Sequence, residues 1–408
     1  MTNTIQLCPL RFGAAILLSC ALMMGGNADA KTGLGRSGKK PATRAAVSCD
    51  GQWHLMATAN PATQANDYNS LDALTALSTS DVWAVGIFDR FSESGYKTLA
   101  EHWDGRKWKL VSTPNSSQLN SVLAGVAATG TKDVWAVGYQ SPASGPYSTL
   151  VEHWNGTAWK IVPSGTFTGL LTSVAAVAPD DVWAVGSTDY VGGGLIMHWN
   201  GKTWKQTILN QQVYFRAVTA ISKSDVWAVG QLTNSTGVGD LTYAVHFDGT
   251  HWTHVPTPSP FRRHDLDQDW LTSLTALSSK DVWASAVWRD GDYGILDHTF
   301  AEHWDGKSWQ VVHTLNPGGN SMYHDFWGVA ALNSGSVWAV GSAGLNTIHP
   351  FVEHGNGTAW NIVKTVPIAD GSLLAIAGVK SSSLILATGN HFKSGYSQTL
   401  AEYACGVQ

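Results

Sequence analysis

The hexapeptide DVWAVG at residues 81–86 is the first of seven copies, which are spaced 44 to 56 residues apart. The later copies are DVWAVG at 133, 181 and 225, DVWASA at 281, SVWAVG at 336 and LILATG at 384. A short apolar run between polar turns is typical of a strand that is buried on both faces. The chain therefore repeats one buried strand seven times.

Each copy belongs to a larger unit with three further predicted strands. An alternating segment such as LTALSTS (74–80) precedes the hexapeptide, while EHWDG (101–105) and a segment opened by a second tryptophan, WKLV (108–111), follow it. The Asp-Gly or Asn-Gly pair between the last two strands is typical of a tight hairpin turn. Four short strands in a repeat of this length are typical of a β-propeller blade. The sequence therefore predicts an all-β, seven-bladed β-propeller over residues 48–408.

The two ends of the chain are predicted to complete one blade together. The seventh unit ends at TLAEYACGVQ (399–408) after only three strands, and the missing strand is predicted in SCDGQWHLMAT (48–58). Pairing of these segments would close the ring. Cys49 and Cys405 flank the closing turn and are the only cysteines after residue 30, so we expect a disulfide between them in an oxidising compartment.

These motifs resemble those of the Trp-rich β-propellers of secreted bacterial proteins over nearly all of residues 48–408. The turn WDGRKW (103–108) is also similar to the Asp-box of sialidase-type propellers, but its Asp–Gly spacing is one residue shorter and the leading Ser is absent. The His of EHW is similar to the structural histidine of WD-repeat propellers, in a different residue order. The resemblance implies the fold and transfers no functional residue, because fold and activity separate freely in propellers.

The N-terminus has the pattern of an export signal. Residues 12–26 are apolar, and ADA at 28–30 provides the small residues of a cleavage site, so we expect a signal peptide cut after Ala30. The segment LLSC (17–20) leaves open a lipoprotein that is acylated on Cys20. Elsewhere the sequence lacks the roughly 20 consecutive apolar residues of a membrane helix. A secreted or periplasmic protein is therefore expected.

Charge is distributed unevenly along the chain. Residues 31–47 carry five basic residues and no acidic one, which predicts a flexible basic linker. The whole chain has 25 Lys and Arg against 30 Asp and Glu, a net charge of −5. Because residues 1–47 contribute +5, residues 48–408 carry −10. This acidic body argues against a nucleic-acid partner, whose phosphates require clustered basic residues. We expect a monomer.

Residues that the repeat does not explain gather in units five and six. Seventeen of the 20 tryptophans occupy three repeated positions, and only Trp270, Trp288 and Trp327 remain. Most of the histidines outside the repeated EHW position lie in the same two units. The longest inter-blade segment, TPSPFRRHDLDQDW (257–270), also enters unit five.

Three long segments are predicted to meet near the ring axis on one face: 257–270, 287–298 and 320–327. They combine aromatic rings, which stack on sugars, with side chains that bond hydroxyls or exchange protons. The expected proton-transfer and contact residues are His264, His324, Tyr323 and Arg289. The expected substrate-binding residues are Arg263, Asp265, Asp267, Trp270, Trp288, Asp290, Tyr293, Asp325 and Trp327.

The predicted function is an exported, carbohydrate-directed propeller that binds a glycan, with cleavage left open. A lyase would need His264, His324 or Tyr323 as base and an arginine to neutralise a uronate. A hydrolase would instead use two of the aspartates as carboxylates placed across the sugar. The alternative is a non-catalytic binding or scaffold propeller of the cell envelope that recognises a protein or a glycan.

The loops do not repeat from blade to blade, which favours a single site over a multivalent lectin. The sequence predicts no cofactor. HDLD (264–267) together with His324 and Asp325 leaves a divalent metal open, although their spacing matches no defined metal motif.

Overall fold

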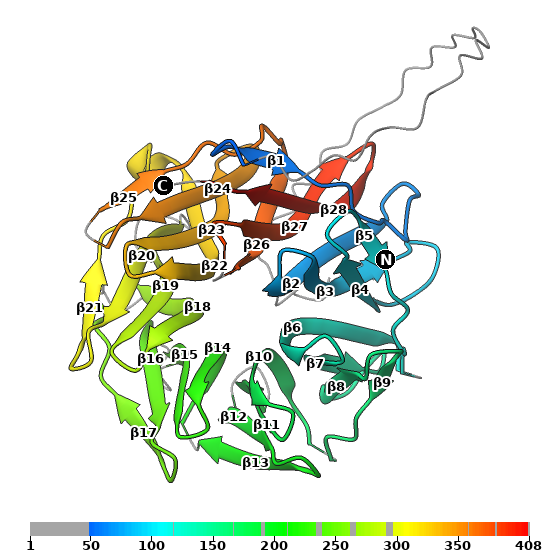
Figure 1. Ribbon diagram of the computed structural model, residues 1–408, viewed down its shortest axis with the longest axis horizontal. Helices are drawn as coiled ribbons and strands as arrows, with labels where there is room; N and C mark the ends of the chain where they lie inside the picture. The colour runs from blue at the N-terminus through cyan, green and yellow to red at the C-terminus, as the bar shows by residue number, and fades with distance from the viewer. Residues whose placement is uncertain are drawn as a thin grey trace, which may run out of the picture. The chain divides into compact units, whose positions relative to one another are not determined.

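The computed structural model describes residues 49–406 except 117, 166, 189–191, 210, 234–238, 262–266, 291–296, 358 and 380–381. The predicted seven-bladed β-propeller is confirmed: in this part of the chain, 28 strands form seven four-stranded antiparallel sheets around a ring (Figure 1). A single turn of 3-10 helix, η1 (Gly319–Ser321), precedes the sixth blade. The predicted signal peptide and basic linker lie outside the described residues.

The blades follow one another in chain order, and the strands of each blade run from the innermost outward. Blades one to three are β2 (Tyr68–Ser78), β3 (Asp81–Asp89), β4 (Lys97–Trp103), β5 (Trp108–Leu110); β6 (Asn120–Gly130), β7 (Asp133–Ser141), β8 (Ser148–Trp154), β9 (Trp159–Ile161); and β10 (Leu170–Ala178), β11 (Asp181–Ser187), β12 (Gly194–Trp199), β13 (Trp204–Leu209). Blades four and five are β14 (Val213–Ser222), β15 (Asp225–Thr233), β16 (Asp240–Phe247), β17 (Trp252–Val255); and β18 (Gln268–Ser278), β19 (Asp281–Arg289), β20 (Asp297–Trp304), β21 (Trp309–Val312). Blades six and seven are β22 (Tyr323–Asn333), β23 (Ser336–Gly344), β24 (Ile348–Gly355), β25 (Trp360–Ile362); and β26 (Gly371–Gly378), β27 (Ile385–Lys393), β28 (Tyr396–Ala404), β1 (Trp53–Leu55).

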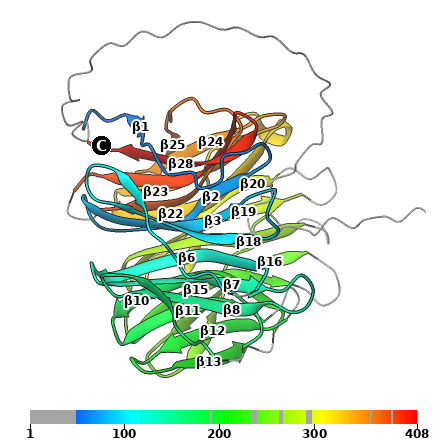
Figure 2. The same cartoon turned by 90° about the vertical axis from the view of Figure 1, so that its right-hand side faces the viewer.

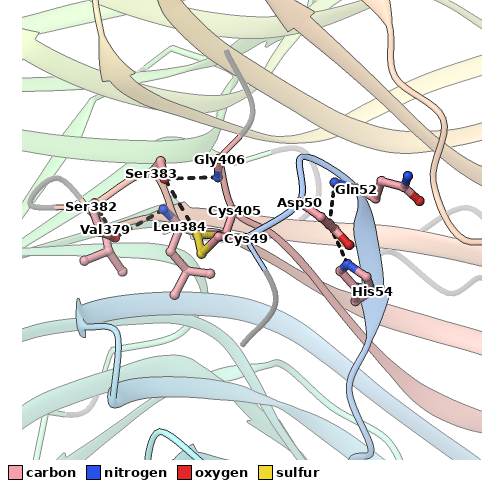
Figure 3. The surroundings of a disulfide bond; sticks show 10 residues. All are labelled: Cys49, Asp50, Gln52, His54, Val379, Ser382, Ser383, Leu384, Cys405 and Gly406. Atoms are coloured by element: carbon pink, nitrogen blue, oxygen red, sulfur yellow. Dashed lines mark hydrogen bonds and ion pairs between the residues drawn. A yellow bond between two sulfur atoms is a disulfide. The ribbon is translucent and has the colours of Figure 1, made fainter. Parts of the chain in front are cut away.

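The ring closes as predicted, by pairing of the two ends of the chain. Trp53 lies opposite Ala404 in the antiparallel pair of β1 and β28, which lie side by side in both views (Figures 1 and 2). The predicted disulfide between Cys49 and Cys405 is present beside this pair, with the two Cα atoms 4.5 Å apart (Figure 3). Disulfides are typical of proteins in an oxidising, extracytoplasmic environment.

The residues of the DVWAVG motif have separate structural roles. Asp81 accepts a 2.7 Å hydrogen bond from His102 Nε2, and that imidazole lies 4.5 Å from the ring of Trp83. Trp83 reaches the next blade, where its ring lies 5.3 Å from the ring of Trp159. The core therefore lies between adjacent blades rather than within one, as the buried clusters around the ring confirm.

The closing Gly of the hexapeptide accommodates a bulge in the innermost strand. A Cβ atom on Gly86 would lie 2.1 Å from the carbonyl oxygen of Ser70, a distance that no side chain tolerates. The register of the first two strands skips one residue at this point in every blade, which is the pattern of a β-bulge. The skipped residues are Asp72, Ala124, Thr172, Arg216, Thr272, Trp327 and Leu374.

A buried carboxyl on the third strand of five blades was not predicted from the sequence. The residues are the Glu of the EHW motif and its relatives: Glu101, Glu152, Glu302, Glu353 and Glu402, all fully buried. Glu101 accepts a 3.0 Å hydrogen bond from the backbone N–H of Ala59, in the segment that enters its blade, and Glu353 accepts one from Leu315 in the same way. Burial raises the pKa of Glu101 to about 7 and that of Glu353 to about 8.

Candidate functional site

Within the described residues, the three predicted segments do meet. The ring of Phe261 stacks on Trp288 at 4.8 Å, and Trp288 stacks on His298 at 4.6 Å. The ring of His298 lies 6.3 Å from His324 on the innermost strand of blade six. The segment that enters blade five, the ends of β19 and β20 and the start of β22 thus form one continuous region. Four predicted site residues lie outside the described residues: Arg263, His264, Asp265 and Tyr293.

Arg289 and two carboxyl groups form the polar centre of this region. Arg289 donates to both carboxylate oxygens of Asp297, from Nε at 2.5 Å and from a terminal nitrogen at 2.8 Å. Asp325, from the next blade, hydrogen-bonds to the same Asp297 carboxylate. Burial and the negative charge of Asp297 raise the pKa of Asp325 well above its usual range. Arg289 and Asp297 therefore form an ion pair, and the surroundings of Asp325 disfavour its charged form.

The predicted role of His324 in proton transfer does not fit its position. The side chain is fully buried, packed between His298 and the ring of Phe351 at 5.4 Å. Burial lowers the pKa of His324 to about 4. The backbone carbonyls of Met322 and Pro317 lie close enough to oppose this shift, but neither imidazole nitrogen forms a hydrogen bond within the described residues. A neutral imidazole without solvent contact cannot reach a ligand in this conformation.

The three unexplained tryptophans are not equivalent. Trp288 lies between the rings of Phe261 and His298, so neither of its faces is open to a sugar. Trp270 is only 7% exposed. Trp327 is half-buried at the bulge of β22, and no stacking of another ring on it occurs among the described residues. Of the three, Trp327 alone combines partial exposure with no described ring stacked on it.

The predicted aspartates also differ from one another. Asp267 is 2% exposed, so it is a structural residue, whereas Asp290 follows β19 and is half-buried. Tyr323 begins β22 and is half-buried; burial raises the pKa of its phenol. It therefore stays protonated at neutral pH, which suits hydrogen bonding rather than general-base catalysis.

Arg216 is a central residue that the sequence reasoning missed. It is the bulge residue of β14, and its guanidinium lies 5.3 Å from the ring of Tyr214 and 5.7 Å from that of Trp270. The second arginine, Arg289, lies 5.4 Å from the same Trp270 ring. Trp270 is therefore a platform for two cations rather than for a sugar. In the sequence, Arg216 is distinguished only as an arginine at a position where the other units have residues of other types. The sequence-based prediction used the unexplained tryptophans and histidines instead.

A hydrogen-bonded chain fixes the orientation of Arg216. Its Nε donates to Gln231 Oε1 at 2.8 Å, and Gln231 Nε2 donates to Asp240 Oδ2 at 2.5 Å. Burial lowers the pKa of Arg216, while the charges of Asp240 and Asp297 oppose the shift. Neighbouring residues surround the guanidinium, but the residue keeps partial solvent exposure. This fits a side chain that points into the centre of the ring, which solvent reaches.

Tyrosines of blade two and an aspartate of blade one interact with the neighbourhood of Arg216 through Tyr214. Tyr139 interacts electrostatically with Tyr214 of blade four, with Asp72 of blade one and with Tyr147 of its own blade. Residues of blades one, two and four can approach each other only around the axis (Figure 1). We call Asp72, Tyr139, Tyr147, Tyr214, Arg216 and Arg289 the axial cluster.

A separate hollow of about 260 Å³ lies between β8, β9 and the segment that leads to blade three. It is lined by residues such as Gln140, Thr149 and Ile161, and its described lining has no charged side chain. The axial cluster is therefore the stronger candidate.

Comparison with known proteins adds support for the fold. By sequence, the chain matches no protein family and no curated protein. A polysaccharide lyase, an ulvan lyase, is 9% identical over 81% of this chain and 91% of its own, with a TM-score of 0.53. The Swd1 β-propeller domain of Myceliophteria thermophila is 8% identical over 86% and 99%, with a TM-score of 0.50. YCF48 bound to a D1 peptide is 16% identical over 86% and 94%, with a TM-score of 0.49. The likenesses to the lyase and to the Swd1 domain support the β-propeller fold and no more.

The described part of the chain lacks two further features. It contains no group of three or more His, Cys, Asp or Glu side chains placed to hold a metal ion. The same residues include no helix that is long and apolar enough to span a membrane.

Proposed function

We propose that the protein is a secreted or periplasmic binding propeller whose axial cluster holds an acidic saccharide without cleaving it. Arg216 carries the proposal. Within the described residues it has no direct carboxylate partner, because Asp240 is reached only through Gln231. Removing a cation from water without a paired anion is costly. A bound carboxylate would complete the two-pronged pairing that guanidinium groups favour.

The surrounding side chains suit a sugar ring. Tyr214, Tyr323 and Trp327 are half-buried, so each keeps exposed ring surface and, for the tyrosines, a hydroxyl. Aromatic faces next to a few fixed polar groups are typical of small-molecule sites. The net charge of −10 on residues 48–408 would repel a polyanion at a distance. We therefore infer a saccharide with isolated acidic groups rather than a continuous polyuronate.

Binding is favoured over cleavage because the catalytic groups do not fit together. A lyase base is lacking among the described candidates, since His324 is buried and the pKa of Tyr323 is raised. Hydrolysis requires two carboxyls about 5 to 9.5 Å apart. Asp297 and Asp325 instead share a hydrogen bond, which leaves no room for a sugar between them.

The test compares two saccharides that differ in one group. Calorimetric titration of the full chain would use a tetrasaccharide with one glucuronate and the same molecule with that carboxylate reduced to an alcohol. We expect the acidic form to bind about tenfold or more tightly, the range of a charged hydrogen bond. Arg216→Gln should remove this preference.

Arg106→Gln is the matched control, because Arg106 is exposed on a blade-one hairpin turn far along the strand order from the axis. It should bind as the unchanged protein does. Equal affinity for the two saccharides, or full binding by Arg216→Gln, would refute the proposal. Measurable depolymerisation of either sugar would restore the catalytic alternative.

A further inference from the structure

Blade two contributes a corner of two tyrosines to the axial cluster. Tyr139 lies near the C-terminal end of β7, and Tyr147 directly precedes β8 in the same blade. Their ring centroids lie 5.1 Å apart with the planes at 84°. Two perpendicular rings form a corner with two π surfaces, and both side chains are only half-buried.

A carboxylate from the neighbouring blade interacts electrostatically with this corner. Asp72 is the bulge residue of β2, and its negative charge acts on Tyr139. Ser70 Oγ donates a short hydrogen bond to Asp72 Oδ1 and accepts one of 3.0 Å from Asn390 Nδ2. The Asn390–Ser70 pair thereby holds the Asp72 carboxylate in one orientation.

We propose that Tyr139, Tyr147 and Asp72 form a binding site for an ammonium group. Aromatic faces attract a cation through their quadrupole, and the attraction is stronger when water is excluded. A carboxylate adds a full negative charge on the third side. Neutral sugars would gain much less from this arrangement, because they have no charge for the rings to attract.

Two parts of the axial cluster together define a ligand class. Arg216 of blade four offers a cation to an acidic group, and Asp72 with the tyrosines of blade two offers negative potential to a basic group. The two parts adjoin, because Tyr139 interacts with Tyr214, which lies beside Arg216. The ligand would be a saccharide that carries both an acidic and an amino group. This last step rests on the proposed function, whereas the ammonium site itself does not.

The test uses choline and its uncharged carbon analogue, 3,3-dimethyl-1-butanol, titrated into the full chain at pH 7.5. Burial raises the pKa of Asp72 to about 6, so the carboxylate is ionised at this pH. We expect choline to bind at least tenfold more tightly than the analogue. Asp72→Asn and Tyr147→Leu should each weaken choline by about tenfold, while Tyr147→Phe, which keeps the ring, should not.

Equal binding of choline and the analogue, or unchanged choline binding in Tyr147→Leu, would overturn the inference. If Asp72→Asn fails to fold, the Tyr147→Leu and Tyr147→Phe pair still decides the question. Arg216→Gln should leave choline binding unchanged. In the unchanged protein, choline binding without a glucuronate preference would refute only the proposed function, and a glucuronate preference without choline binding would refute only the ammonium site.

Discussion

Asp325 hydrogen-bonds to Asp297, whose two carboxylate oxygens are both already bonded to Arg289. Two carboxyls in contact cannot both ionise, so one of them retains its proton. Arg289 determines which one, because its guanidinium stabilises the charge on Asp297. The pair joins the second and third strands of blade five to the innermost strand of blade six. It is therefore first of all an inter-blade contact.

The different roles of Asp297 and Asp325 predict that their substitution affects stability unequally. Asp325→Asn supplies an amide donor in place of the protonated carboxyl, so the free energy of unfolding should change by less than about 1 kcal/mol. Asp297→Asn leaves Arg289 without its anion and should cost about 3 to 5 kcal/mol. Urea unfolding at pH 7 measures both changes. Equal losses would show that Asp325 is charged.

The sequence-based expectation for Arg289 changes accordingly. It was predicted on a loop and in ligand contact, but the structure has it as the last residue of β19, paired with a carboxylate that is 6% exposed. Arg289→Ala should therefore lower the melting temperature as well as any binding. Arg216 is the better probe of function, because its only described hydrogen bond is to a neutral amide.

Closure of the ring predicts a second stability effect. The disulfide joins residues 356 positions apart, and the loop-entropy treatment assigns such a crosslink on the order of 5 kcal/mol. The double variant Cys49→Ser, Cys405→Ser should lose a stability of this size and keep its fold, because β1 still pairs with β28. Unfolding in urea with and without reductant tests this. A reduced protein as stable as the oxidised one would show that strand pairing alone closes the ring.

Repetition explains why the architecture could be predicted. Asp81, Trp83, Gly86 and His102 each make a contact that most blades repeat, so the residues recur and reveal the strands. The closing strand was predictable on the same basis, because the seventh unit shows only three strands and a complete blade needs four.

The candidate site was predicted less well, because sequence does not tell which neighbour covers a side chain. Trp288 and Trp327 look alike in the sequence, yet only Trp288 is stacked between two rings. Arg216 occurs once and so has no periodic signal. The buried Glu of EHW was periodic, but its lack of solvent depends on the packing of blades that are distant in sequence.

These buried glutamates predict a pH dependence. Burial raises the pKa of Glu152 to about 8, and neither of its carboxyl oxygens has a hydrogen-bond partner among the described residues. Between about pH 4.5 and 8 the unfolded chain has released this proton while the folded protein retains it. The group's contribution to stability is thus fully present below pH 4.5 and declines by up to about 1.4 kcal/mol per pH unit as pH rises.

Glu152→Gln removes this titration. The free energy of unfolding of the variant relative to the unchanged protein should therefore increase steadily from pH 5 to pH 8 in urea titrations. Glu93→Gln, at a side chain that is 57% exposed, is the control and should show no such trend. A difference that is constant across this pH range would mean that Glu152 is ionised throughout.

The two tryptophans of blades five and six allow packing and ligand contact to be separated. Trp288→Leu removes a ring from the stack of Phe261 and His298, so it should cost about 3 kcal/mol of stability, as large-to-small changes in packed regions do. Trp327→Leu alters a half-buried ring on which no described ring stacks, and should cost less than about 1 kcal/mol.

In the glucuronate titration, however, Trp327→Leu should weaken binding several-fold, because aromatic contact with the sugar is lost. Trp288→Leu, measured well below its melting temperature, should bind nearly as the unchanged protein does. The opposite ranking in both experiments would mean that the ligand approaches blade five rather than the axial face of blade six.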